Sequence, residues 1–396
     1  MNTIDQVSLK GKRVLIRVDF NLPLDENLNI TDDSRMVAGL PTIKKVIDDG
    51  GMAIILSHLG RPKNGFEEKF SLKNTVKHLS KLLARPVAFS SDCIGKNTTA
   101  DVAKMNNGDV LILENLRFYT EETTGDEAFA KKLAELGDVY VNDAFGAAHR
   151  AHASTAIIAK FFPKNKYFGF LLAKEVTCLE KALSNPKRPF TAIIGGAKIT
   201  GKIDVIKSLF DKVDNLIIGG GMAYTFAKAM GGKIGKSLVE DEKVALAKQL
   251  IDQAKSKGVN LLLPTDSLNA DAFKNSANTH LSNIANIENN FMGLDIGPKS
   301  IALFSDIISR SKTIIWNGPM GVFEMEKFEN GTKQIGEAIC LATENGAFSL
   351  VGGGDSVAAV QKFNFENRMS YISTGGGAML EYLEGKQLPG VVAILD

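Results

Sequence analysis

Short apolar runs alternate with helical patterns along the chain. The runs 12–20 (KRVLIRVDF), 52–57 (MAIILS), 109–113 and 139–141 are mostly apolar, which is typical of strands buried on both faces of a parallel sheet. The segment that opens at Asp32-Asp33-Ser34 and runs to Asp48 instead has helical periodicity, and its first residues suit the first turn of a helix. The alternation predicts an α/β fold with parallel sheets.

Four apolar runs stop at a group of glycines and resume with a helical pattern. They are 192–198 (AIIGGAK), 216–223 (LIIGGGMA), 349–363 (SLVGGGDSVAAVQKF) and 371–383 (YISTGGGAMLEYL). Glycines at such a turn let backbone N–H groups approach an anion that the helix N-terminus already favours. Tight turns also require glycine, but four copies favour phosphate binding. Asp355 directly follows one triplet, where a carboxylate can hold Mg²⁺.

A chain of 396 residues is longer than a domain with a single hydrophobic core usually is, so two domains are expected. The stretch 185–189 (NPKRP), which ends a helical pattern at 174–183, is the best candidate for a boundary. A second series of strands and helices begins at Phe190.

Composition is that of a globular protein, with 44% hydrophobic and 23% charged residues. A net charge of +2 argues against a nucleic-acid or anionic membrane partner. No apolar run approaches the roughly 20 residues of a membrane-spanning helix, and no secretion signal is visible. Cys93, Cys178 and Cys340 form no metal or redox motif, which indicates reduced core residues in a cytoplasmic protein.

Arginine is concentrated in the first 150 residues, with seven against three in the rest: Arg13, Arg17, Arg35, Arg61, Arg85, Arg117 and Arg150. Because the guanidinium group grips carboxylates and phosphates with two hydrogen bonds, this part of the chain is suited to a small, multiply charged anion. Ordinary surface arginines would explain some of them.

The four predicted strands of this first part end in polar residues, at Asp19/Asn21, at 58–61 (HLGR), at 114–117 (ENLR) and at 142–152. Parallel strands place ligands at their carboxyl edge, where Asp19 and Asn21 could bind a substrate hydroxyl. Turn formation alone is the alternative for this pair. His149 and His152 lack a third ligand at a convincing spacing, so a catalytic zinc is not expected.

The segment 196–202 fits the body of a P-loop, but Ile203 replaces the Ser or Thr that would reach Mg²⁺, so a P-loop enzyme is rejected. Lys198 and Lys202 can still serve phosphates from one helical face. No G-x-G-x-x-G follows a strand, which argues against a nicotinamide-dependent dehydrogenase. Glu324, beyond the predicted strand 313–316, either binds ribose hydroxyls or is a solvated loop residue.

Together these motifs resemble the phosphoglycerate kinase family. The resemblance is carried, in order, by 17–23 (RVDFNLP), 57–62 (SHLGRP), 113–118 (LENLRF), 142–154 (NDAFGAAHRAHAS), 195–202 (GGAKITGK), 316–324 (WNGPMGVFE), 352–356 (GGGDS) and 373–378 (STGGGA). It extends from about residue 7 to the closing 388–391 (LPGV).

The resemblance implies two doubly wound parallel-sheet α/β domains joined by a helix across a cleft. Residues 1–172 would bind phosphoglycerate, 173–380 would bind the nucleotide and begin with the linker helix, and 381–396 would pack back on the first domain. The implied activity is the glycolytic, reversible, Mg²⁺-dependent transfer of a phosphoryl group from 1,3-bisphosphoglycerate to ADP, which gives ATP and 3-phosphoglycerate. The implied protein is a cytoplasmic monomer with no nucleic-acid or membrane partner.

The resemblance also implies roles for individual residues. The phosphoglycerate site would comprise Asp19, Asn21, Arg35, His58, Leu59, Gly60, Arg61, Arg117 and Arg150. The nucleotide site would comprise Lys198, Lys202, Glu324, Gly353, Gly354, Asp355 and Ser356, with Asp355 next to Mg²⁺ and with Gly219, Gly220, Gly221 and Gly293 lining the adenine pocket. The family usually carries Asp at the position of Gly201, and the departure is expected to have a modest effect on nucleotide affinity.

A mechanism follows as a hypothesis, in which alignment and charge stabilisation perform the transfer. Arg35 and Lys202 would flank the migrating group, and backbone N–H groups near Gly375, Gly376 and Gly377 would add donors. No general base is needed, because the acceptor carboxylate is already ionised. Two rival hypotheses are another kinase or phosphosugar enzyme on a similar frame, and a nucleotide-binding scaffold that has lost its chemistry.

Overall fold

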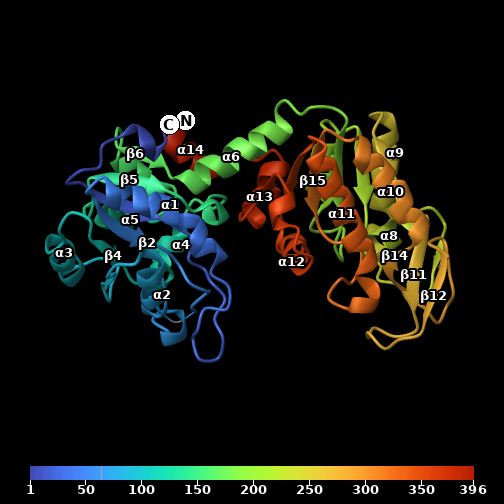
Figure 1. Ribbon diagram of the computed structural model, residues 1–396, viewed down its shortest axis with the longest axis horizontal. Coiled ribbons are helices and arrows are strands. Elements are labelled where there is room, and N and C mark those ends of the chain that lie inside the picture. The colour runs from blue at the N-terminus through green and yellow to red at the C-terminus, as the bar shows by residue number, and fades with distance from the viewer. Residues whose placement is uncertain (64) are drawn as a thin grey trace. The chain divides into compact units, whose positions relative to one another are not determined.

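The computed structural model describes residues 1–63 and 65–396. The chain divides into two compact units, one made of Met1–Thr177 with Gln387–Asp396 and the other of Cys178–Lys386. Each unit contains a six-stranded sheet whose paired strands are parallel (Figure 1), which confirms the predicted α/β class. The functional limits expected near residues 172 and 380 stay a prediction.

The first unit is built on a sheet with the order β3-β4-β2-β1-β5-β6. Its strands are β1 (Arg13–Arg17), β2 (Met52–Leu56), β3 (Ala88–Phe89), β4 (Val110–Ile112), β5 (Val139–Asn142) and β6 (Lys166–Phe168). Its helices are α1 (Ser34–Asp48), α2 (Lys73–Leu83), α3 (Lys96–Ala103), α4 (Thr120–Thr124), α5 (Glu127–Ala134) and α14 (Pro389–Leu395), with 3₁₀ turns η1 (Ile4–Gln6), η2 (Glu68–Phe70), η3 (Leu116–Phe118), η4 (Phe145–Ala147) and η5 (Ile157–Phe161). Helix α6 (Phe170–Leu183) continues from this unit into the next.

The second unit repeats the plan with the order β10-β8-β7-β15-β16-β17. Its strands are β7 (Phe190–Ile194), β8 (Asn215–Ile218), β9 (Lys233–Ile234), β10 (Asn260–Leu262), β11 (Asp266–Ala270), β12 (Thr279–Asn283), β13 (Asn286–Ile287), β14 (Met292–Ile296), β15 (Thr313–Asn317), β16 (Phe348–Val351) and β17 (Tyr371–Ile372). Its helices are α7 (Ile203–Leu209), α8 (Met222–Ala229), α9 (Val244–Ser256), α10 (Pro298–Arg310), α11 (Asn330–Glu344), α12 (Gly354–Lys362) and α13 (Gly377–Leu383), with 3₁₀ turns η6 (Asp241–Lys243), η7 (Glu326–Phe328) and η8 (Glu366–Arg368).

In each main sheet the chain first places strands on one side of its first strand and later places strands on the other side. In the first sheet the two sides meet between β1 and β5, and in the second they meet between β7 and β15. Ligands of open α/β sheets bind in the crevice outside the carboxyl ends of the strands at such a point. A binding site is therefore expected at the loops that follow these four strands.

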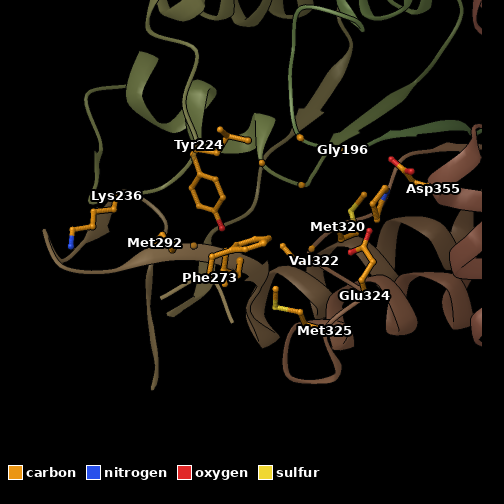
Figure 2. Close-up of a pocket in the computed structure, with 18 residues that line it drawn as sticks. Gly196, Tyr224, Lys236, Phe273, Met292, Met320, Val322, Glu324, Met325 and Asp355 are labelled. Atoms are coloured by element: carbon orange, nitrogen blue, oxygen red, sulfur yellow. The ribbon is translucent and has the colours of Figure 1, made fainter. Parts of the chain in front are cut away.

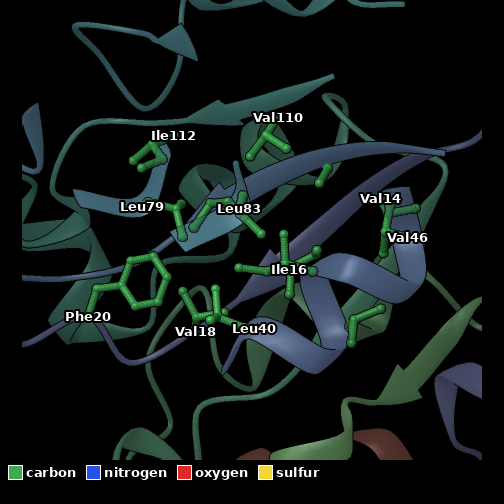
Figure 3. Packing of buried hydrophobic residues seen from close by; sticks show 14 of the residues in the cluster. Val14, Ile16, Val18, Phe20, Leu40, Val46, Leu79, Leu83, Val110 and Ile112 are labelled. Atoms are coloured by element: carbon green, nitrogen blue, oxygen red, sulfur yellow. The ribbon is translucent and has the colours of Figure 1, made fainter. Parts of the chain in front are cut away.

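The core of the first unit surrounds β1. Figure 3 shows Ile16 among apolar side chains of α1 and α2, including Leu40, Val46 and Leu83. These side chains are almost completely buried, as expected for a strand with helices against its sheet. The second unit has its own core around Trp316, whose indole N–H donates to the carbonyl of Gly318 at 2.8 Å.

The C-terminal helix α14 belongs to the first unit. The Asn142 side-chain amide donates to the carbonyl of Gly390 at 3.0 Å, and the Gly390 N–H donates to the carbonyl of Ala148 at 2.8 Å. Figure 1 shows the two ends of the chain close together, and the Phe168 N–H donates to the carbonyl of Asn2 at 2.8 Å.

The strands and helices that the sequence predicts are present within a few residues of their expected ends. All four glycine groups lie between a strand and a helix, or between a strand and the loop that precedes a helix. The Asp32 carboxylate accepts a hydrogen bond from the Ser34 N–H at 2.8 Å at the start of α1, whereas Asp33 contacts His78 at 2.8 Å. In the described ranges no helix is long and apolar enough to cross a membrane.

One part of the fold was not predicted. Strands β12, β11 and β14 form an antiparallel sheet in the second unit, and the small parallel pair β13-β9 adjoins β12 in sequence. Most of β12 is exposed, so its residues show no apolar run that would have revealed a strand.

Replacing Ile16 by Ala should lower the free energy of unfolding of the first unit by about 2–5 kcal/mol, because the truncation leaves a cavity in a closed core. Val37, on the outer face of α1, is 44% exposed, and Val37→Ala should change the free energy of unfolding by about 0.5 kcal/mol or less. Denaturant titration followed by circular dichroism measures both. Equal effects of the two variants would contradict the assignment of this core.

Candidate functional site

Basic side chains of the first unit gather at the carboxyl ends of β1, β2, β4 and β5. They come from the last residue of β1, from the segments that follow β2, β4 and β5, and from the first turn of α1, and they are Arg17, Arg35, His58, Arg61, Arg117, Arg150 and His152. Their charges act on one another: those of Arg17, Arg117, Arg35 and His152 lower the pKa of His58. Arg61 acts in the same way on Arg117, and Arg150 acts on His152. We call this set the basic cluster.

Polar contacts hold several side chains of the basic cluster in place. The Arg35 guanidinium lies 3.4 Å from an Asp19 carboxylate oxygen and donates to the backbone carbonyl of Asn21 at 3.1 Å. The Asn21 side-chain oxygen accepts from the Gly60 N–H at 2.8 Å, and the Gly60 carbonyl accepts from Arg117 at 2.8 Å. These contacts join three loops before any ligand arrives.

Gly60 must be glycine in this arrangement. Its φ is +62°, and a Cβ atom there would overlap the ring of Phe70. The Leu59 side chain is buried in the core, so this residue can offer only its backbone, whose carbonyl accepts from the Asn115 side chain at 2.7 Å.

A buried polar chain supports the cluster from below. Arg17 is only 1% exposed, and its guanidinium donates to the Ser154 hydroxyl at 2.9 Å and to the carbonyl of Val18. The Ser154 hydroxyl in turn donates to the buried Glu122 carboxylate at 2.6 Å. The Glu122 carboxylate is therefore connected to Arg17 by two successive hydrogen bonds through Ser154, and its negative charge offsets part of the cost of burying this cation.

The same guanidinium sets the state of His58. An Arg17 nitrogen lies 3.1 Å from Nδ1 of His58, and an arginine side chain can only donate, so Nδ1 is the acceptor. The neutral ring then carries its proton on Nε2. Burial, together with the charges of Arg17, Arg117, Arg35 and His152, holds the pKa of His58 well below its ordinary value.

Burial also lowers the pKa of two neighbours. It acts with the charge of Arg17 to lower the pKa of Arg117 to about 10, a value at which the group remains a cation at neutral pH. Burial and the charges of Arg17, Arg117 and Arg150 lower the pKa of His152 to about 4. The cluster thus combines permanent cations with neutral imidazoles, which is the lining that a small anion requires.

The second unit contains a cavity of about 680 Å³ next to the loops that follow β7, β8 and β15. Its wall is largely apolar and includes Tyr224, Phe273, Met292, Met320, Val322 and Met325, together with the backbone of Gly196, Gly220, Gly221, Gly293 and Gly321. Figure 2 shows the rings of Tyr224 and Phe273 on one side of the cavity and the carboxylates of Glu324 and Asp355 toward the other. Such a cavity suits a flat, mostly apolar group with a polar end.

Asp355 also lines a second cavity, of about 260 Å³, so the two cavities share this residue. This smaller cavity is lined by Lys202, Asn317, Gly318, Gly353, Gly354, Asp355, Ser356, Gly376, Gly377 and Leu380. Helix α12 begins at Gly354, so its N-terminal N–H groups lie at this cavity, a place that favours an anion. Ser356 accepts from the Gly318 N–H at 2.6 Å and thereby ties α12 to the loop after β15.

Lys202 brings a positive charge to the smaller cavity. Burial lowers its pKa to about 8, and the nearby Asp355 charge opposes this shift. Lys198 is exposed in the loop before α7 and lines neither cavity. In the described ranges, no three or more His, Cys, Asp or Glu side chains are grouped as a metal site.

Two of the glycines suggested by the sequence lie behind these surfaces. Gly375 is buried and its N–H donates to the Ser373 hydroxyl at 3.1 Å, whereas Gly376 and Gly377 reach the smaller cavity. Gly219 packs against the side chain of Met320, and Gly220 and Gly293 line the larger cavity.

Several residues at these sites were not chosen from the sequence. Glu122 and Ser154 act from below the surface, next to Arg17 of the predicted arginine set. Tyr224 and Phe273 come from a helix and from a loop that had no recognisable motif. Asn317 ends a central parallel strand, in the way that Asp19 follows one. The expectation that ligands bind at the carboxyl ends of parallel strands would therefore also have selected Asn317.

Comparison with known proteins decides the family. The family model for phosphoglycerate kinase matches residues 4–386. This chain belongs to the phosphoglycerate kinase family. The phosphoglycerate kinases of Porphyromonas gingivalis and Chloroherpeton thalassium are each 53% identical to it, over 99% of this chain and 99% and 98% of theirs. The structure of phosphoglycerate kinase from Coxiella burnetii is 43% identical with a TM-score of 0.91, and the match covers 99% of this chain and 98% of that chain.

The family fixes the reaction. This glycolytic kinase transfers a phosphoryl group reversibly between 1,3-bisphosphoglycerate and ADP, giving 3-phosphoglycerate and ATP. Both substrates are small, anionic molecules, and the phosphoglycerate kinase fold offers a basic cluster in one unit and a glycine-lined cavity in the other.

The neutral state of His152 leads to a pH-dependent stability. Its folded pKa of about 4 lies below the ordinary value of 6.5, so the unfolded chain binds the extra proton first as the pH falls. The stability that depends on a neutral His152 is fully present above pH 6.5 and is lost between about pH 6.5 and 4. The largest resulting loss in the free energy of unfolding is about 3 kcal/mol. The difference in unfolding free energy between pH 7.5 and 5 should therefore be smaller for His152→Gln than for the wild type.

The exposed His280 provides the matched control for this measurement. His280→Gln should leave the pH dependence of the unfolding free energy unchanged. If His152→Gln behaves in the same way as that control, His152 is not held neutral in the folded protein.

Proposed function

We propose that the basic cluster binds 3-phosphoglycerate or 1,3-bisphosphoglycerate and that the two cavities that share Asp355 bind ADP or ATP. The observation that carries this assignment is the chemical difference between the sites. One site collects five arginines around neutral imidazoles, and the other has an apolar cavity that shares Asp355 with a smaller cavity at a helix N-terminus with Lys202. The first suits a compact polyanion, and the second suits a base attached to phosphates.

In the first site, Arg35, Arg61, Arg117 and Arg150 would hold the phosphate and carboxylate groups, and His58 would donate from Nε2. Asp19 and Asn21 would hydrogen-bond the substrate hydroxyl. Arg35 is half-buried and already joined to Asp19 and Asn21, so little side-chain freedom remains to be lost on binding. Leu59 and Gly60 would contribute backbone groups.

In the second site, the base would lie between Tyr224 and Phe273 against the backbone of Gly220 and Gly293, and Glu324 would accept from the ribose hydroxyls. Lys202 would bind the phosphates together with the amides of Gly353, Gly354 and Ser356. Lys198, which lines neither cavity, would have to swing in from the exposed loop before α7 to reach them. Gly376 and Gly377, and Gly375 through its fixed turn, would shape the opposite side, while Gly219 would support the base pocket from behind.

Mg²⁺ would enter as part of the nucleotide substrate. This ion keeps most of its waters and is held by one or two carboxylates together with substrate phosphates. Asp355 is exposed and lies at the junction of the two cavities, where the nucleotide phosphates would pass. The ion would neutralise phosphate charge, and the chain would contribute the Asp355 carboxylate to its ligands.

The transfer breaks the bond between phosphorus and the carboxylate oxygen of 1,3-bisphosphoglycerate and forms a bond to a terminal oxygen of ADP. The leaving group is a stable carboxylate, so no proton has to move and no general base is needed. Arg35 and Lys202 would stabilise the charge on the group in transit. Direct transfer requires the two bound substrates to meet, so the proposal includes a step in which the units bring them together and exclude water.

We also propose that the protein works as a cytoplasmic monomer without nucleic-acid or membrane partners, which accords with its net charge of +2. Gly201 should change nucleotide affinity only modestly relative to relatives that carry Asp there. A Cβ atom at Gly201 would meet nothing within 4 Å, so the backbone course does not depend on glycine.

A single assay tests the proposed function. ATP, Mg²⁺ and 3-phosphoglycerate are added to the protein, and the formation of ADP is followed. ADP formation that requires all three supports the proposal. ADP formation without 3-phosphoglycerate would favour a different kinase, and no ADP formation at all would favour a nucleotide-binding scaffold.

Arg35→Ala should lower kcat by about 10²- to 10³-fold and change the KM for 3-phosphoglycerate much less, because Arg35 is assigned to the group in transit. Steady-state kinetics in both directions provide the measurement. The control is Lys44→Ala on an exposed position of the same helix, which should have no effect. An increase in KM at constant kcat would remove Arg35 from transition-state stabilisation.

Asp355→Ala should lower the Mg²⁺-dependent kcat/KM for ATP by about 10²-fold or more and raise the Mg²⁺ concentration required for half-maximal rate, because the ion loses its protein carboxylate. Asp252, which is exposed on α9, offers a control carboxylate whose removal should change neither value. A normal Mg²⁺ titration of Asp355→Ala would exclude this residue from the metal site.

A further inference from the structure

Glu240 is an almost buried acidic residue that belongs neither to the basic cluster nor to the lining of the two cavities. It lies between β9 and η6 in the second unit, and its side chain is 9% exposed. It lines neither cavity, so a direct contact with a bound nucleotide is not its role. Its carboxylate points instead into the backbone of the loop before α7.

The carboxylate binds the two residues at the centre of this loop. One oxygen accepts from the Ile199 N–H at 2.5 Å and from the Thr200 N–H at 3.3 Å. The other accepts from the Thr200 hydroxyl at 2.5 Å. Ile199 and Thr200 lie between Lys198 and Lys202, so the contact fixes the stretch that carries both lysines.

The charge of Glu240 strengthens this contact. Partial burial raises its pKa, but hydrogen bonds from Thr200 and Ile199 and the charge of Lys198 together hold the pKa of the carboxyl below its usual value. Glu240 is therefore ionised at neutral pH, and hydrogen bonds to an ionised acceptor are stronger than neutral ones. The N-terminal residues of α7 have no side-chain cap of their own, since Lys202 occupies the cap position without such a bond.

The segment around Glu240 also contacts the wall of the larger cavity. The Glu240 N–H donates to the buried Thr225 hydroxyl of α8 at 3.2 Å, and the Ser237 hydroxyl accepts from the Gly293 N–H at 2.9 Å. Lys236 and Leu238 of the same segment line the cavity itself. Residues 236–240 thus connect the proposed base pocket with the loop that carries the proposed phosphate-binding lysines.

We propose that Glu240 is a positioning residue for the nucleotide: it holds the loop of Lys198 and Lys202 at a fixed distance from the base pocket. The inference rests on the proposed function of that loop. Without the carboxylate, two N–H groups lose their acceptor and the loop can move relative to α8 and β14, so a nucleotide must order it on binding.

Kinetics with each substrate separately test this role. Glu240→Ala should raise the KM for ADP and for ATP by about tenfold or more and lower kcat, while the KM for 3-phosphoglycerate stays within about twofold of the wild type. Glu240→Gln should restore most of the loss, because its amide oxygen can accept from the two N–H groups and its NH₂ can donate to Thr200. A purely structural role would lower stability without this difference between substrates.

Asp241, the next residue, provides the matched control. It is exposed and pairs with Lys228 at 2.6 Å, and Asp241→Ala should leave both KM values unchanged. If Glu240→Ala does not fold, Thr200→Val removes one of the same contacts from an exposed position and should raise the nucleotide KM while sparing that for 3-phosphoglycerate. Wild-type nucleotide KM values in the folded Glu240 variant, or in Thr200→Val in its place, would overturn the inference.

The variant Lys202→Ala distinguishes a failure of the inference about Glu240 from a failure of the proposed nucleotide-binding function of the loop. A large loss with Lys202→Ala and none with Glu240→Ala would mean that the loop binds nucleotide but does not need Glu240. Wild-type nucleotide kinetics for Lys202→Ala would instead reject the proposed function of the loop.

Discussion

The strands of each main sheet are hydrogen-bonded in parallel, and this single direction determines where chemistry can occur. Because β1, β2, β4 and β5 all point the same way, the residues that follow them emerge at one edge of the first sheet. The second sheet does the same with β7, β8 and β15. Residues that are more than a hundred positions apart in sequence are thereby brought together, and one antiparallel strand at the centre would send its loop to the opposite edge.

The basic cluster is electrostatically unfavourable on its own. Burial and the neighbouring cations together lower the pKa of Arg117 and keep the imidazoles of His58 and His152 neutral. Asp19 and the buried Glu122 compensate only part of this charge, through Arg35 and through Ser154. A site that retains excess positive charge while its side chains are held in place is prepared for an anion, because binding relieves repulsion without much rearrangement.

The parts of the fold that could be predicted are those in which local pattern and tertiary position agree. The apolar runs of β1, β2 and β15 and the periodicity of α1 are of this kind. The antiparallel sheet was missed because an exposed strand such as β12 has no apolar run. Polar residues that follow apolar runs revealed Asp19 and His58, whereas the buried chain of Arg17, Ser154 and Glu122 depends on contacts across the fold that no spacing encodes.

Residues 387–396 complete the first unit, although the whole second unit, Cys178–Lys386, precedes them in the chain. During synthesis from the N-terminus, more than half of the chain is therefore made after residue 177 and before α14, which covers the apolar surface beside β6 and η5. The second unit is continuous and is under no such delay. Translation would thus leave this part of the first unit's apolar surface uncovered until the last residues have been made.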